Sequence, residues 1–403
     1  MEPHRLEVAD VFRKHGAEYL EAYAPSASLE HKLVLRSLAR CRTAALGGHK
    51  IRYSCGHEEI SYNSCHDRHC PKCQGEARKK WLDARAADLL RVGYFHVVFT
   101  LPDELGPIAL QNRRQVYGLL FRAVSETLLT IARDPKHLGA EIGFLAVLHT
   151  WGQNLHIHPH VHCVVPGGGI SPDGSRWISS RKRFFLPVRV LSRLFRKKFL
   201  NFLREAQARG KIQFHGKLAY LSDPESWKVF LQSINKRDWV VYSKPPFGGP
   251  TQVLKYLARY THRVAISNQR LASLQDGKVT FEWKDYAHGN TRREMTITAV
   301  EFIRRFLQHV LPKGFMHIRH YGILANRGRK KKLALARQIL GEHGQEDTNV
   351  ETPSGQDALE APTREASAFC PICRKGRLVS CEAFAPERQS TRSETPHLTF
   401  DTS

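Results

Sequence analysis

The sequence predicts an α+β fold: a central antiparallel sheet with flanking helices, and a separate cysteine-rich module near the N-terminus. Short strand-like runs alternate with segments of helical periodicity along the middle of the chain. Turn residues join neighbouring strand candidates, and no strict strand–helix–strand repetition is present, which favours antiparallel pairing. Four of the nine cysteines fall between Cys55 and Cys73, in a segment with little apolar periodicity.

The N-terminal part consists of helical stretches on either side of a polar segment. Residues 1–50 carry apolar side chains near helical spacing, and Gly47-Gly48 ends that region. Residues 51–75 are too polar to form a core alone, so a metal would have to hold them together. A helix rich in Ala, Leu, Arg and Lys follows over residues 76–91.

The middle of the chain alternates strands and helices. We predict strands over residues 94–100, 143–150, 160–165, 239–243, 264–267, 279–284, 294–298 and 317–321. We predict helices over residues 107–133, 187–206, 250–260 and 300–310. Pro250 suits the first position of the third of these helices, because proline there loses no helical hydrogen bond.

The composition changes after residue 340. The following residues are rich in Glu, Asp, Thr, Pro, Ser and Gly, which is typical of disorder. We therefore predict four parts: a helical, metal-binding module (1–90), a main α+β domain (91–340), a disordered linker (341–368) and a cysteine-containing tail (369–403).

The charge balance points to a polyanionic partner. The 403 residues include 62 Lys+Arg and 38 Asp+Glu, which gives a formal net charge of +24. Nucleic acid is favoured over a membrane, because no basic amphipathic anchor and no run of about 18 apolar residues stands out. The N-terminus lacks the apolar core of a secretory signal, so we expect a cytoplasmic protein with reduced cysteines.

The cysteine cluster has the spacing of a structural zinc site. Cys70 and Cys73 form a Cys-x-x-Cys knuckle, and Cys55 and Cys65 could complete four thiolate ligands. His57 is an alternative ligand, and the remaining candidates are His66, His69 and, further away, His49. Four protein ligands leave no open position, so the role would be structural.

A second cluster places five histidines within residues 149–162. Side chains alternate on a strand, so His160 and His162 share one face and could bind one divalent ion. The third ligand stays open among four residues: His158, Gln153, His156 and His149.

Tyr256 and Tyr260 form a third feature. On a helix they stand four positions apart, so both hydroxyls would emerge from one face. A packed aromatic stripe is the ordinary explanation of such a pair. Next to a metal-binding strand and a large positive charge, a tyrosine hydroxyl becomes a candidate nucleophile for a phosphodiester.

Taken together, these features resemble the rolling-circle insertion-sequence transposases of the two-tyrosine HUH endonuclease class. The runs that carry the resemblance are SYNSCHDRHCPKCQ, HIHPHVHCVVPGGG, YLARYTHRVAIS and HIRHYGILANR. It implies an HUH-type nuclease domain over residues 91–340 and a DNA-binding zinc module before it. It further implies that Tyr256 and Tyr260 attack the scissile phosphate to give a 5′-phosphotyrosine, while His160 and His162 hold Mg²⁺ or Mn²⁺.

Two basic runs would contact single-stranded DNA at the element ends. Residues 181–198 contain eight basic residues, residues 327–337 contain six, and neither run contains an acidic one. Phosphate contacts by such runs supply sequence-independent affinity. The candidates are Arg181, Lys182, Arg183, Arg196, Lys197, Lys198, Arg329, Lys330 and Lys331. No nucleotide cofactor is expected, because the phosphotyrosine conserves the bond energy and no phosphate-binding loop motif is present.

Three alternatives use part of the same evidence. A zinc-dependent DNA-binding regulator without chemistry would leave the histidine and tyrosine pairs without a purpose. A metallophosphohydrolase would use the histidines without a covalent intermediate. A plasmid replication initiator or relaxase would share the HUH chemistry. The Cys370-x-x-Cys373 pair stays open as a second zinc site, for which Cys381 or His397 would have to supply a ligand.

Overall fold

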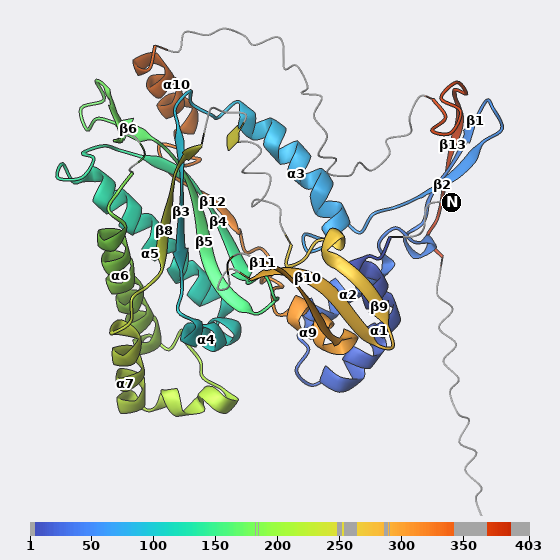
Figure 1. The fold of residues 1–403 in the computed structure, drawn as a ribbon, viewed down its shortest axis with the longest axis horizontal. Helices are drawn as coiled ribbons and strands as arrows, with labels where there is room; N and C mark the ends of the chain where they lie inside the picture. Colours follow the sequence, from blue (N-terminus) through green and yellow to red (C-terminus); the bar gives the residue numbers. More distant parts are fainter. Residues whose placement is uncertain are drawn as a thin grey trace, which may run out of the picture.

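A five-stranded antiparallel sheet organises the larger part of the molecule in a computed structural model of the chain (Figure 1). The structure describes residues 5–181, 183, 185–247, 252–253, 264–285, 289, 291–341 and 369–387. The strand order is β12-β4-β5-β3-β8, and every neighbouring pair is antiparallel. The strands are β3 (Tyr94–Thr100), β4 (Gly143–Trp151), β5 (Ile157–Pro166), β8 (Val241–Phe247) and β12 (Ile318–Gly322). The predicted central antiparallel sheet is therefore confirmed.

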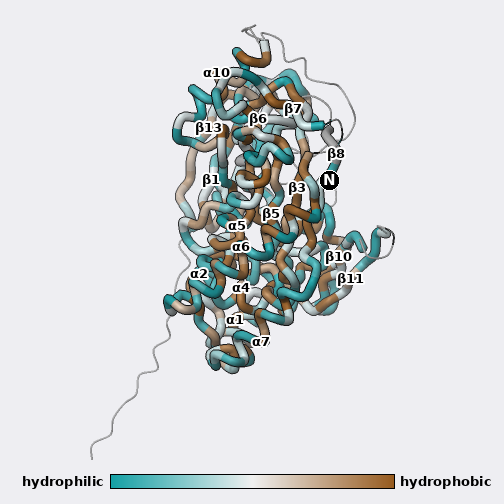
Figure 2. Tube along the Cα trace, turned by 90° about the vertical axis from the view of Figure 1, so that its left-hand side faces the viewer, coloured by the Kyte–Doolittle hydropathy of each residue, from teal (hydrophilic) through white to brown (hydrophobic). Residues whose placement is uncertain are grey.

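Helices cover one face of this sheet. Alternate residues of the central strands, such as Phe99, Val161 and Cys163, point into the main core and are fully buried. The helices that pack there are α4 (Gly106–Gln111), α5 (Arg113–Arg133), α6 (Val188–Ala208) and α7 (Pro224–Asn235). In Figure 2, hydrophobic (brown) stretches run along β3 and β5, consistent with strands buried in the middle of a domain.

The opposite face of the sheet carries a smaller apolar cluster. Leu145, Val147 and Val164 form it together with Val253, whose side chain is fully buried. Helix α3 (Pro71–Ala86) lies along this side and adds Trp81 (Figure 1). The histidine-bearing end of β5 lies on this same face, because its residues 160 and 162 have the parity of Val164.

A second core joins the N-terminal helices to residues 265–310. Helices α1 (Val8–Tyr23) and α2 (Leu29–Arg40) pack on α9 (Ala299–Leu307). Phe12 meets Phe306 edge to face, with ring centroids 5.2 Å apart. The antiparallel strands β9 (Leu271–Gln275), β10 (Lys278–Asp285) and β11 (Thr291–Thr298) complete this core. Packing thus crosses the boundary expected near residue 90; the four-part division itself stays a prediction.

A small three-stranded sheet lies at the edge of the molecule. Its order is β13-β1-β2, with β1 (Gly48–Tyr53) between β2 (Glu58–Tyr62) and β13 (Leu378–Phe384). The expected tail thus contributes a strand that pairs with the N-terminal hairpin. Residues 342–368 of the expected linker and residues 388–403 lie outside the described residues.

Several local expectations were wrong. Residues 264–267 form no strand: the backbone is irregular, Val264 is buried, and Ala265 and Ile266 belong to the second core. The helix expected over 107–133 breaks at Asn112, whose side-chain amide donates to the carbonyls of Ile108 and Gln213. Residues 48–50, expected in a helical region, begin β1.

Some elements were not predicted at all. Helix α7 and strands β2, β9 and β13 were missed, as were the short strands β6 (Gly168–Ile170) and β7 (Trp177–Ser179). The second basic run lies mostly in helix α10 (Arg329–Ile339). No helix in the described part of the chain has the length and apolarity needed to cross a membrane.

Candidate functional site

Three histidines converge on the face of the sheet that α5 and α6 leave uncovered. A ring nitrogen from each of His149, His160 and His162 lies within 4.8 Å of the others. The ring centroids of His160 and His162 are 4.8 Å apart, and those of His149 and His162 are 4.5 Å apart. His149 and His162 are buried and His160 is half-buried. Three imidazoles at this spacing could hold one divalent ion.

The strand register explains why these three meet. His160 and His162 stand two residues apart on β5, and Val161 between them points into the main core. His149 on β4 lies directly opposite His160 in the antiparallel pairing. The ring of Trp151 stacks on His149 with centroids 4.7 Å apart, which limits the directions in which that imidazole can turn.

A fourth histidine supports the cluster from β3. His96 Nε2 lies 2.8 Å from His162 Nδ1, and the two rings are nearly parallel, with an interplanar angle of 7°. Burial, followed by the positive charge of Lys244, lowers the pKa of His96 to about 3. His96 was not predicted as part of this site, although its position on the predicted strand 94–100 was a usable signal.

The structure separates the alternatives for a third ligand. His149 joins His160 and His162, as one of the four options allowed. His158 Nδ1 instead faces Asp103, with 3.4 Å between the nitrogen and the carboxylate oxygen. The carbonyl of Gln153 accepts a hydrogen bond from Arg270. The side chain of His156 is largely exposed. Its partial loss of hydration and the positive charge of Arg305 lower its pKa.

Tyr256 and Tyr260 lie outside the described residues. The described residue nearest before them is Val253, in a short helical stretch at 252–253. Val253 packs with Leu145, Val147 and Val164, on the same face of the sheet as the three histidines. The chain therefore reaches this face three residues before Tyr256.

The edge strand β8 extends this face with an aromatic and a basic side chain. Tyr242 pairs with Val98, and Lys244 pairs with His96, so both point to the histidine side. Both side chains are exposed, and Lys244 Nζ lies 5.9 Å from the centroid of the Tyr242 ring. An exposed aromatic ring beside a cation is an arrangement that binds single-stranded nucleic acid. Neither residue was predicted from the sequence.

Four cysteines form a compact cluster: Cys41, Cys65, Cys70 and Cys73. Three of the sulfur–sulfur distances are 3.6, 3.6 and 3.8 Å. Zinc–sulfur bonds of about 2.3 Å in a tetrahedron put the sulfurs about 3.8 Å apart, so this donor set fits zinc. Cys41 caps the end of α2, and Cys70 precedes Pro71 at the start of α3.

The expected ligand set needs one correction. Cys65, Cys70 and Cys73 come together as predicted, but the fourth member is Cys41 and not Cys55. Cys55 lies in the turn between β1 and β2, where it meets Cys370 and Cys373. His57 stacks on Tyr53 and does not belong to the four-cysteine cluster.

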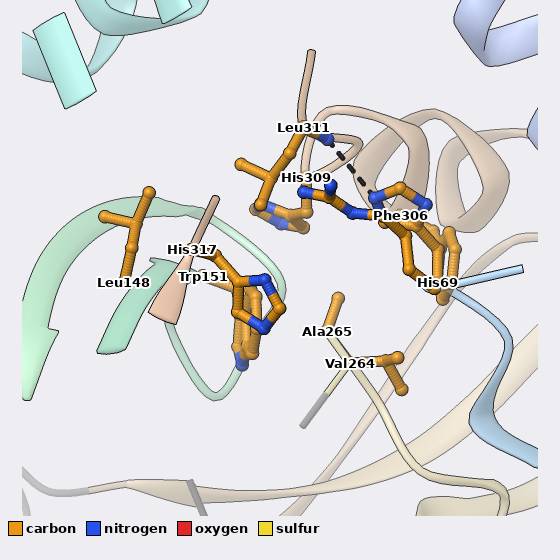
Figure 3. A pocket seen from close by; sticks show the side chains of 10 residues that line it. His69, Leu148, Trp151, Val264, Ala265, Phe306, His309, Leu311 and His317 are labelled. Atoms are coloured by element: carbon orange, nitrogen blue, oxygen red, sulfur yellow. Dashed lines mark hydrogen bonds between the residues drawn. The ribbon is translucent and has the colours of Figure 1, made fainter. Parts of the chain in front are cut away.

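Figure 3 shows how His69, in the loop of the cysteine cluster, is joined to Leu311, in the segment between α9 and β12. The backbone N–H of Leu311 donates to His69 Nε2 at 3.2 Å, and Arg68 donates to the carbonyl of Phe315 at 2.9 Å. A cavity lined by Arg68, His69, Leu311, Trp151 and His309 has a volume of about 30 Å³. That is room for about one water molecule, so the cavity is too small to bind a substrate.

The predicted DNA-contacting residues divide into three groups. Arg181 and Arg183 are exposed before α6, and Lys182 lies outside the described residues. On α6, Arg196 donates to the carbonyl of Arg237 at 2.7 Å, Lys198 pairs with Glu126 at 2.8 Å, and Lys197 is exposed. On α10, Lys330 and Lys331 are exposed, whereas Arg329 lies 3.8 Å from Asp88.

Neither helix stands beside the histidines. Helix α6 covers the opposite face of the sheet, and α10 packs near Leu90 and Ile170, beyond the end of β5 (Figure 1). Any DNA that contacts these helices and the histidines together must therefore wrap around the sheet.

Two family descriptions match the chain. The family described as "Transposase zinc-binding domain" matches residues 11–101, which contain the four-cysteine cluster. The family described as "Putative transposase" matches residues 143–332, which contain the three clustered histidines and both tyrosines.

Individual relatives extend this similarity over most of the chain. A Sinorhizobium fredii (strain NBRC 101917 / NGR234) protein named "Putative transposase y4qJ" is 54% identical over 380 residues, which cover 94% of this chain and 95% of that protein. The "Transposase for insertion sequence element IS801" of Pseudomonas savastanoi pv. phaseolicola is 30% identical over 303 residues, 74% of this chain and 71% of that protein. No solved structure matches the chain.

Proposed function

The chain belongs to the IS91/IS801 family of transposases, and on that premise we propose that it nicks and joins single-stranded DNA through a 5′-phosphotyrosine, in a rolling-circle type of transposition. One observation carries this proposal: His149, His160 and His162 converge on the face of the sheet on which Val253 packs. Tyr256 follows Val253 by three residues. An extended chain covers only about 11 Å in three residues, which is the greatest distance that can separate these two positions.

Tyr256 and Tyr260 are the proposed nucleophiles. The phenolic oxygen of one tyrosine forms a bond to the scissile phosphorus while the bond from phosphorus to the 3′ oxygen breaks. The tyrosine hydroxyl gives up its proton, the 3′ oxygen leaves as an alkoxide and takes up one proton to become a 3′ hydroxyl, and the 5′ phosphate stays on the tyrosine. Because the phosphotyrosine keeps the energy of the phosphodiester, rejoining needs no nucleotide cofactor. Two tyrosines allow two linked strand transfers.

The three histidines would hold a divalent ion at this site. Such an ion supplies positive charge that offsets the charge developing on the phosphate oxygens. Imidazole donors suit zinc and other transition metals, whereas Mg²⁺ and Mn²⁺ are expected from the resemblance to HUH endonucleases. Among the residues described, His149 is the proposed third ligand, in place of His158 and Gln153.

Charge and aromatic surface support single-stranded DNA as the substrate. The net charge of +24 suits a polyanion. Tyr242 and Lys244, both on β8, lie on the histidine face of the sheet. We propose that this strip guides the strand at the site. The basic residues of α6 and α10 would contact flanking backbone phosphates further along the DNA.

The four cysteines Cys41, Cys65, Cys70 and Cys73 are the proposed ligands of a structural zinc ion. The ion would fix the end of α2 against the start of α3. Arg68 and His69 bind the loop to residues 311–315, so this zinc would also hold the module against the body of the protein.

A covalent-adduct assay tests the proposal. An oligonucleotide from one end of the DNA element that encodes this chain is labelled at its 3′ end. With Mn²⁺, a labelled protein band should survive denaturing electrophoresis, and EDTA should abolish it. Replacing both Tyr256 and Tyr260 with Phe should also abolish it, whereas the matched Tyr220→Phe should not.

The outcomes separate the proposal from its alternatives. An adduct that persists in the double variant would refute the assignment of the nucleophiles. Phosphoester turnover without any adduct would indicate a metallophosphohydrolase, and metal-independent binding without cleavage would indicate a regulator. A replication initiator or relaxase would form the same adduct, but the two relatives above are named as transposases.

A further inference from the structure

A second group of cysteines lies where the β1–β2 hairpin meets the segment before β13. The sulfur atoms of Cys55, Cys370 and Cys373 lie within 4.8 Å of one another. Cys55 stands in the turn of the β1–β2 hairpin, and the other two stand in the loop just before β13. All three are free thiols; Cys370 is buried, and Cys55 and Cys373 are exposed.

Backbone hydrogen bonds fold the C-terminal loop into a metal-binding knuckle. The N–H of Arg374 donates to the carbonyl of Cys370 at 2.9 Å, and the N–H of Gly376 donates to Cys373 Sγ at 3.3 Å. Arg374 adopts a left-handed conformation with φ of 59°, which turns the chain back after Cys373. Amide donors to ligand sulfurs are the partners that orient thiolates around a metal.

The N-terminal turn is fitted closely to this loop. The N–H of Ser54 donates to the carbonyl of Arg377 at 2.8 Å, and the N–H of Arg377 donates to Ser54 Oγ at 3.0 Å. A Cβ atom on Gly376 would lie 2.6 Å from Cys55 Sγ. Only glycine at this position therefore lets the Cys55 sulfur approach the other two thiols.

We propose that Cys55, Cys370 and Cys373 bind a second structural zinc ion that fastens β13 to the N-terminal hairpin. Three thiols on two tight turns match the ligand type and the pairing of turns in structural zinc sites. A disulfide would use two of the thiols and leave the third unexplained. His57, two residues after Cys55 in the sequence, is our candidate for the fourth position.

A zinc ion at this site would stabilise the pairing of β13 with β1. β13 pairs along the whole of β1, from Gly48 opposite Phe384 to Tyr53 opposite Leu378. Yet its side chains are mostly exposed, and among the described residues the buried apolar cluster beneath it consists of Ile51, Tyr53 and Cys370. So small a core stabilises little, and small domains of this kind depend on metals or disulfides.

Zinc content tests the proposal on the full-length protein. Purified with a reducing agent and without added zinc, the wild type should contain two cysteine-bound zinc ions per chain by elemental analysis, besides any zinc that the three clustered histidines retain. Cys373→Ser should contain one zinc ion fewer than the wild type, and Cys65→Ser should lose the other cysteine-bound ion. The matched control Cys381→Ser changes an exposed cysteine of β13 outside the cluster and should keep two. Equal zinc in Cys373→Ser and wild type would overturn the proposal.

A second measurement needs no variant and so covers the case in which Cys373→Ser does not fold. Cobalt replaces zinc in the wild type, and its thiolate charge-transfer absorption grows with the number of cobalt–sulfur bonds. The two clusters together offer seven cysteines, four and three. An intensity that corresponds to seven bonds supports the second site, and one that corresponds to four refutes it. Neither measurement involves DNA cleavage, so the result is independent of the proposed function.

Discussion

The imidazole rings of His96 and His162 lie parallel, with His96 Nε2 2.8 Å from His162 Nδ1. This contact determines which ring nitrogen of His162 carries the proton. If His162 binds a metal through Nε2, its Nδ1 carries the proton and donates to His96 Nε2, which must then be neutral. His96 is buried on β3 and so is held ready to accept that hydrogen bond. It is a positioning residue for the proposed metal site.

Replacing His96 should weaken metal binding without removing a ligand. We expect His96→Leu to raise the Mn²⁺ concentration for half-maximal adduct formation by about 10- to 100-fold, the range typical of such outer partners. A titration of adduct yield against Mn²⁺ measures this. His158→Gln is the matched control, because His158 faces Asp103 outside the cluster. An unchanged Mn²⁺ requirement in His96→Leu would contradict the role.

The exposed pair on β8 gives a prediction about DNA affinity. We expect Tyr242→Ala to raise the Kd for single-stranded DNA about tenfold, because stacking on one base contributes about 1–3 kcal/mol. Lys244→Gln should reduce the slope of log Kd against log salt by about 0.7, the value for one phosphate contact on a single strand. Fluorescence anisotropy over a salt series measures both.

Tyr220→Ala serves as the control for this surface. Tyr220 is 58% exposed, similar to Tyr242 at 49%, but it precedes α7 on the helical side of the sheet. Equal loss of affinity in the two variants would mean that single-stranded DNA does not follow β8.

The histidine cluster could be predicted only in part. Strand alternation alone puts His160 and His162 on one face, because neighbouring side chains within a strand depend on local backbone geometry. His149 and His96 reach the same face through pairing with β4 and β3, and a single sequence does not specify the register of such pairs. For the same reason, the positions of Tyr242 and Lys244 on this face could not be predicted without the pairing of β8 with β3.

The cysteines show the same limit. Cys70 and Cys73 share one helical turn, so their partnership could be predicted from spacing. Cys55 is closer in sequence to that pair than Cys41, but the β1–β2 hairpin carries it away to the C-terminal strand. Strand β13 was missed because its partner, β1, lies more than three hundred residues earlier in the chain.

The four-cysteine cluster leads to a prediction about stability. We expect Cys41→Ser to lose one zinc ion and to lower the Tm of the N-terminal module, since zinc binding contributes directly to folding. Differential scanning calorimetry with elemental analysis measures both. Cys163→Ser is the control: Cys163 is fully buried in the main core, away from both cysteine clusters, and should keep the zinc content. Full zinc in Cys41→Ser would instead favour another fourth ligand.

The buried His309 predicts how stability depends on pH. Thr150 Oγ1 lies 3.2 Å from His309 Nδ1, and His309 Nε2 lies 3.0 Å from the carbonyl of Leu155, to which it donates. Burial lowers the pKa of His309 to about 3, against 6.5 when unfolded. As the pH falls below about 6.5 the unfolded chain takes up the proton first, so this residue's contribution is complete above pH 6.5 and declines toward pH 3.

The decline in unfolding free energy should be measurable by comparing the wild type with His309→Gln at two pH values. Between pH 6.5 and 5 the wild type should lose about 2 kcal/mol of unfolding free energy through His309 alone. His309→Gln should be less stable at pH 7.5, and its deficit relative to the wild type should shrink at pH 5, because glutamine does not titrate. Urea unfolding at the two pH values measures both deficits. His215→Gln, at an exposed position, should follow the wild type at both. A deficit for His309→Gln that stays constant with pH would show that the proton on His309 does not contribute to acid unfolding.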